Sequence, residues 1–78
     1  MEKEIYIQLL GEGTIVYRPV TAIEITKDIY QLKGRDIYNP EDETWEFLPD
    51  AYVKVEKRIL SGELVLVAVN KEVSMNKQ

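Results

Sequence analysis

The residues of this chain best suited to chemistry are carboxylates, because the sequence contains neither histidine nor cysteine. Those two side chains are the commonest general base near neutral pH and the usual thiol nucleophile. Four acids lie close together instead: Glu41, Asp42, Glu43 and Glu46. They could supply an acid and a base only if one were buried with a raised pKa. Neighbouring acids in a turn are usually solvated, so we expect no enzymatic activity.

Oxygen-bearing side chains around the same acids raise the alternative of a calcium site. The available ligands are Asp36, Asn39, Glu41, Asp42 and Glu43. An EF-hand loop needs ligands at alternate positions, a glycine at the sixth and a glutamate at the twelfth. This spacing does not meet that requirement. We therefore predict no metal ion and no other cofactor.

Aromatic residues are the stronger candidates for binding. A small barrel can gather them into a groove that docks an extended or proline-rich peptide. The candidates for such a groove are Tyr38, Trp45, Pro49 and Tyr52. The alternative is that Trp45 and Phe47 pack in the core while the tyrosine hydroxyls reach the surface.

The acidic turn is a second candidate contact surface. Glu41, Asp42 and Glu43 would form a negative edge suited to a basic protein surface, although a solvated loop explains the same residues. Arg18 could pair with Glu43 or Glu46, and a structural ion pair is the better interpretation than an anion site.

The charge balance limits the class of partner. Fourteen acids against ten bases give a formal net charge of −4, whereas phosphate contacts need a concentrated Lys/Arg surface. We expect no nucleic acid as partner. The N-terminus is charged and no apolar run is long enough to cross a bilayer, so we expect a cytoplasmic protein without membrane contact.

Short strand-like segments must position these residues. They cover residues 5–10, 14–26, 29–33, 45–47, 51–60 and 63–69. Alternation places Ile5, Ile7 and Leu9 on one face of the first segment. Pro19 predicts a sheet edge, a bend or a bulge in the second segment, and we expect a break there. Asn39 followed by Pro40 and acids predicts at most one helical turn near residues 40–44.

These segments predict an all-β fold, because they are closely spaced and no amphipathic helix accompanies them. We expect a small, strongly bent, SH3-like barrel of five or six strands over residues 1–69, followed by a frayed tail over residues 70–78. Residues 63–69 are apolar on both faces, so the outer face is either covered or available for association.

Two segments resemble a group of small bacterial proteins of uncharacterised function. Residues 12–20, EGTIVYRPV, and residues 40–49, PEDETWEFLP, carry the patterns E-G-T-x-V-x-R-P and P-E-D-E-x-W-E-F-x-P of that group. The resemblance covers most of residues 5–69 and implies a bacterial, soluble, single-domain β protein without a defined activity. Asp50 departs from the group, in which Gly commonly follows the last proline of the second pattern.

Residues 48–55, LPDAYVKV, are also similar to the Pro-x-x-Tyr-Val segment of eukaryotic-type SH3 domains. That similarity implies groove positions for Pro49, Tyr52 and Trp45. The function expected from the sequence is a non-catalytic protein-interaction domain that binds a protein partner through an aromatic groove, an acidic edge or both. The alternative is a structural homo-oligomer associating through the outer face of residues 63–69.

Overall fold

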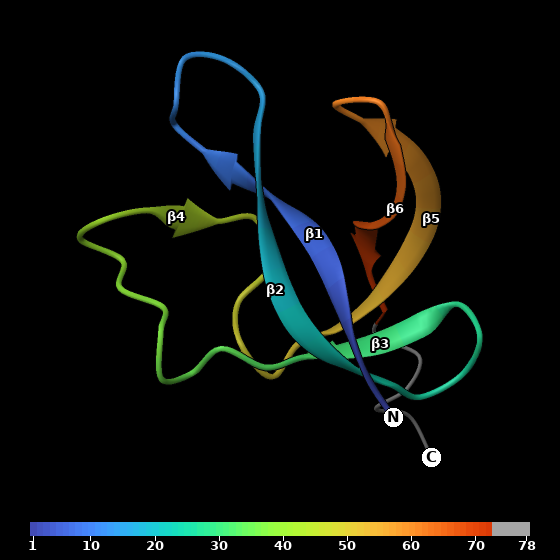
Figure 1. Cartoon of the computed structure of the whole chain (residues 1–78). Coiled ribbons are helices and arrows are strands. Elements are labelled where there is room, and N and C mark those ends of the chain that lie inside the picture. The colour runs from blue at the N-terminus through green and yellow to red at the C-terminus, as the bar shows by residue number, and fades with distance from the viewer. Residues whose placement is uncertain (73–78) are drawn as a thin grey trace.

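The computed structural model describes residues 1–72, which form six strands and no helix (Figure 1). The strands are β1 (Glu2–Leu10), β2 (Val16–Glu24), β3 (Ile29–Leu32), β4 (Thr44–Trp45), β5 (Tyr52–Leu60) and β6 (Glu63–Lys71). The predicted all-β class is confirmed. No helix of this described part has the length and apolar character needed to cross a membrane.

The strands form one sheet in the order β2-β3-β5-β6-β1-β4, and an additional β1–β2 pairing joins five of them into a ring. β1 pairs antiparallel with β2 over most of its length. By contrast, β1 meets β6 in parallel only at Tyr6 and Val67. The predicted small barrel of five or six strands is confirmed, and the β1–β6 seam is its least continuous part.

Alternating residues of the strands fill the barrel. Ile5, Ile7 and Leu9 of β1 are buried together, as their alternation predicts. The other buried members of the core are Val20, Ala22, Tyr30, Leu32, Trp45, Val53, Val55 and Ala68. Burial of this apolar surface is the main stabilising contribution available, because the chain has no cysteine for a disulfide.

The predicted break at Pro19 is wrong, because β2 runs without interruption from Val16 to Glu24. Pro19 lies opposite Tyr6 of β1. On the other side of β2, β3 pairs only with residues 22–24. β2 is therefore an edge strand at Pro19, which confirms the predicted sheet edge, because an edge tolerates a residue that lacks an N–H.

The turns largely follow the sequence signals. Ser61 and Gly62 both have positive φ, 50° and 83°, as a two-residue hairpin turn requires. The Asn39 carbonyl accepts hydrogen bonds from the N–H groups of Asp42 and Glu43, which forms the single turn expected near residues 40–44.

Several predicted segment ends are wrong: β1 begins at Glu2 rather than at residue 5, and β2 covers Val16–Glu24 rather than residues 14–26. β4 ends at Trp45, so Phe47 lies outside it. The predicted tail begins too early, because Asn70 and Lys71 extend β6 and pair with β5. Residues 73–78 of that predicted tail lie outside the described residues.

Candidate functional site

Trp45 lies in the core, with only 2% of its surface exposed. It is opposite Leu9 in the β1–β4 pairing. The Tyr38 ring packs against it with centroids 4.8 Å apart and planes tilted by 54°. The core alternative is therefore confirmed for Trp45. Its ring offers no free face to a peptide, which corrects its expected position as a groove residue.

The carboxylate of Glu43 forms hydrogen bonds with both Trp45 and Arg18. The indole Nε1–H donates to Glu43 Oε1 at 2.9 Å, and Arg18 Nε donates to the same oxygen at 2.6 Å. The guanidinium carbon of Arg18 is 6.0 Å from the Trp45 ring centroid. The hydrogen bond from Trp45, followed by that from Arg18, lowers the pKa of Glu43. The structural ion pair predicted for Arg18 is confirmed, and its partner is Glu43 rather than Glu46.

Glu43→Gln is expected to lower the free energy of unfolding by about 1 kcal/mol at neutral pH, because charge-assisted hydrogen bonds become neutral. The pKa of Glu43 is lower in the folded than in the unfolded state. Its stabilisation is therefore present above the ordinary glutamate pKa of about 4.3 and is lost as the pH falls through the folded value. Urea unfolding across this pH range should show a weaker acid dependence for Glu43→Gln.

Glu41→Gln is the matched control, because Glu41 is exposed in the same turn and makes no side-chain ion pair within residues 1–72. It should leave both stability and its acid dependence near those of the wild type. Equal effects of the two substitutions would contradict the assigned position of Glu43.

The acidic edge is consequently smaller than expected. Glu41 and Asp42 are exposed, and no base of residues 1–72 forms an ion pair with either. Glu43 is engaged by Trp45 and Arg18. Within the described chain, no three acidic residues gather closely enough to hold a metal ion. Only Glu41 and Asp42 of this edge remain available to a partner.

Pro49 and Tyr52 line a shallow hollow of about 320 Å³ at the start of β5. The structure brings these two predicted groove residues together but separates them from Trp45, whose neighbour is Tyr38. Asp50, between them, has a φ of 77°, a conformation that favours glycine. Asp50 therefore has the backbone conformation of the glycine that commonly occupies this position in the group of bacterial proteins. The Asp50 carboxylate accepts a hydrogen bond from Arg35 Nε at 3.0 Å.

The sequence did not indicate a second hollow of about 370 Å³, which lies where the β1–β2 and β5–β6 hairpins end side by side (Figure 1). Its lining residues are Tyr6, Ile15, Tyr17, Ile59, Leu60 and Ser61, and we call it the tyrosine groove. Ile15 is 68% exposed and Ile59 is 69% exposed. Leu64, which pairs with Ile59 across the hairpin, is 63% exposed.

The sequence did not indicate the tyrosine groove because Ile59 has the spacing of a buried residue. Alternation places it on the same strand face as Val53 and Val55, which are buried. However, β3 pairs with β5 only over residues 52–54, so the distal part of the β5–β6 hairpin extends past the strands that cover the core. Ile59 has the spacing of a core residue but is exposed, because β5 is longer than the neighbouring strand β3 that would cover it.

Tyr17 also lines an adjoining hollow of about 200 Å³, together with Gln8, Glu46, Arg58 and Val67 among others. Partial desolvation raises the pKa of Glu46. Val67 is buried, so the outer face of β6 is covered at its centre by the chain itself. The tyrosine groove thus has an apolar end at Ile59 and a polar end beyond Tyr17.

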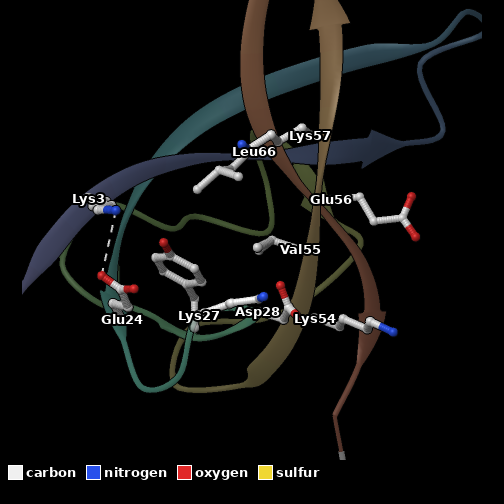
Figure 2. A pocket seen from close by; sticks show the side chains of 10 residues that line it. Lys3, Glu24, Lys27, Asp28, Lys54, Val55, Glu56, Lys57 and Leu66 are labelled. Atoms are coloured by element: carbon white, nitrogen blue, oxygen red, sulfur yellow. Dashed lines mark ion pairs between the residues drawn. The ribbon is translucent and has the colours of Figure 1, made fainter.

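A larger hollow, of about 670 Å³, lies beside the start of β1, the β2–β3 turn and the middle of β5 (Figure 2). We call it the lysine hollow. Its lining residues are Lys3, Glu24, Lys27, Asp28, Tyr30, Lys54, Val55, Glu56, Lys57 and Leu66. None of these residues belongs to the tyrosine groove, so the two hollows are separate features of the surface.

Comparison with known proteins identifies no relative: no protein-family model matches the chain, and no curated protein or solved structure is significantly similar to it.

Proposed function

We propose that this chain is a non-catalytic protein-interaction domain that binds an extended segment of another protein in the tyrosine groove. The supporting observation is the exposure of Ile15, Ile59 and Leu64 around two partly buried tyrosines. Soluble monomers rarely expose such neighbouring large apolar side chains without a binding partner. Tyrosines add a rigid apolar surface and a hydroxyl for hydrogen bonding, which favours them at protein interfaces.

The groove also limits the chemistry of the partner segment. Ile15 and Ile59 offer contacts for apolar side chains, whereas Glu46 and Arg58 in the hollow beyond Tyr17 offer contacts for polar groups. We infer a segment with an apolar anchor and an adjacent polar side chain. The net charge of −4 and the free carboxylates of Glu41 and Asp42 favour approach by a basic protein surface. A cytoplasmic location is part of this proposal.

Selection of short random peptides on the immobilised domain tests the proposal. Selected peptides should share an apolar anchor and should shift the backbone amide resonances of Tyr17 and Ile59 on titration. Ile59→Lys should weaken their binding by roughly tenfold or more, because it places a charge where an apolar anchor docks.

Leu48→Lys is the matched control, since Leu48 is also exposed but lines the hollow at Pro49 and Tyr52. It should leave binding unchanged. Equal loss in both variants, or resonance shifts confined to residues outside the groove, would refute the assignment.

Self-association through the outer face of residues 63–69 is the second candidate, and the partial exposure of Val65 on that face supports it. The contact would use the exposed start of β6, because Val67 at the centre of the strand is buried within the chain. Sedimentation of the wild type over a wide concentration range distinguishes the two candidates. A concentration-dependent mass supports self-association, whereas a monomer at every concentration removes it.

A further inference from the structure

The lining of the lysine hollow contains a buried polar group that lacks a partner among residues 1–72. Tyr30 is only 1% exposed and belongs to the core, yet it lines this hollow. No group of residues 1–72 forms a hydrogen bond with its hydroxyl. Every fully buried side-chain nitrogen or oxygen of the described residues has a hydrogen-bond partner. The Tyr30 oxygen, which has none, must therefore be accessible to solvent. A hydroxyl in this position can donate to a bound ligand.

The charges around Tyr30 are unbalanced. Glu24 is paired with Lys3 at 3.6 Å, and Glu56 is paired with Arg58 at 2.7 Å. Lys27, Lys54 and Lys57 have no ion-pair partner among the described residues, and neither does Asp28. The hollow therefore carries a local excess of positive charge on a protein that is acidic overall.

Figure 2 shows how these side chains are arranged around the hollow. Val55 and Leu66 face its interior, whereas Lys54 and Glu56 extend outward at the rim. Exposed lysine side chains change rotamer within nanoseconds, so the lysines of the lining can adjust their positions around a bound anion. The hollow thus combines an apolar wall, a hydrogen-bond donor and mobile cations.

The strand pairing beside this hollow is irregular. The β5–β6 pairing shifts register between Lys54 and Val55, with Val69 of β6 as the extra residue, and the Val55 N–H donates to the carbonyl oxygen of Asp28. Bulges bend a strand and redirect its side chains, and they are frequent at barrel rims. The single β1–β6 ladder contact, between Tyr6 and Val67, leaves the neighbouring part of the barrel wall without continuous pairing.

We propose that the lysine hollow binds an organic phosphate monoester, with the phosphate accepting a hydrogen bond from Tyr30 and pairing with the free lysines. The apolar body of the ligand lies against Val55 and Leu66. Lys27, Lys54 and Lys57 have no ion-pair partner among residues 1–72, and Asp28 is the one lining carboxylate without such a partner. This excess of positive charge complements a phosphate monoester, which carries a charge of about −1.5 to −2 at pH 7. This ligand occupies a surface separate from the proposed protein-binding groove, so either proposal can fail without the other.

The test uses phenyl phosphate as the probe and follows amide resonances of the whole chain at low ionic strength. We expect saturable shifts at residues 27–30, 54–57 and 66. Binding of phenyl phosphate should be roughly tenfold tighter than that of inorganic phosphate or benzyl alcohol, since each of those lacks half of the recognised chemistry. Phenylacetate tests the charge, and equal or tighter binding of that monoanion would overturn the phosphate assignment.

Tyr30→Phe removes only the hydroxyl oxygen, which has no partner among residues 1–72, so the variant should remain folded. It should bind phenyl phosphate roughly tenfold more weakly. Lys57→Gln should weaken binding severalfold and reduce its salt dependence.

Two controls should behave as wild type: Tyr52→Phe, because Tyr52 lines a different hollow, and Lys33→Gln, because Lys33 pairs with Glu2 elsewhere. Unaltered binding by Tyr30→Phe, equal weakening by Lys33→Gln and Lys57→Gln, or shifts that do not saturate would each overturn the proposal.

Discussion

Trp45→Ala is expected to unfold the domain in water. Removing a fully buried indole loses its transfer free energy and leaves a cavity, at a cost of about 3–5 kcal/mol. That loss is comparable with the whole stability of a chain this small. Trp45 is also the largest of the fully buried side chains, and its removal leaves the Tyr38 ring and the Glu43 carboxylate without their shared neighbour.

Proton NMR dispersion and thermal circular dichroism measure this effect directly. Trp45→Phe is the control, because it retains an aromatic ring for Tyr38 but lacks the N–H that donates to Glu43. It should fold with reduced stability. A dispersed spectrum and an unchanged midpoint for Trp45→Ala would show that the barrel does not depend on the indole, contrary to its 2% exposure.

Gly34→Ala is expected to cost about 2–4 kcal/mol, through backbone strain and overpacking together. Gly34 has a φ of 109°, in a region that residues with a Cβ rarely adopt. A Cβ at this position would lie 2.8 Å from Cη2 and 3.0 Å from Cζ3 of Trp45. Because the indole is held by the core, it cannot move aside without disturbing Tyr38 and Leu9.

Gly13→Ala separates the two causes. Gly13 also has a positive φ, 79°, but a Cβ added there would meet no atom within 4 Å beyond its own chain neighbours. It should therefore lose only the conformational part, about 1 kcal/mol. Urea denaturation of both variants measures the difference. Equal losses would contradict a steric clash with Trp45, and a Gly34→Ala/Trp45→Phe double variant should be less destabilised than the sum of the single changes.

The sequence by itself determined the features that depend on neighbouring residues. Alternation identified Ile5, Ile7 and Leu9 as one buried face, because successive strand side chains point to opposite sides. Ser61 and Gly62 indicated the β5–β6 turn, because Ser-Gly is a dipeptide typical of turns and glycine accepts a positive φ without strain. The absence of histidine and cysteine likewise follows from composition alone, and it leaves carboxylates as the main groups with which the chain could do acid–base chemistry.

The tertiary structure decided which residues remain available for binding. Trp45 has the aromatic side chain expected of a groove residue, but Gly34 and Tyr38 pack against its ring and bury it. Ile59 has the spacing of a core residue, but its hairpin extends beyond β3 and leaves it exposed. Both outcomes depend on which strands become neighbours and how far each one extends. Strand pairing joins residues distant in sequence, and no local pattern specifies it.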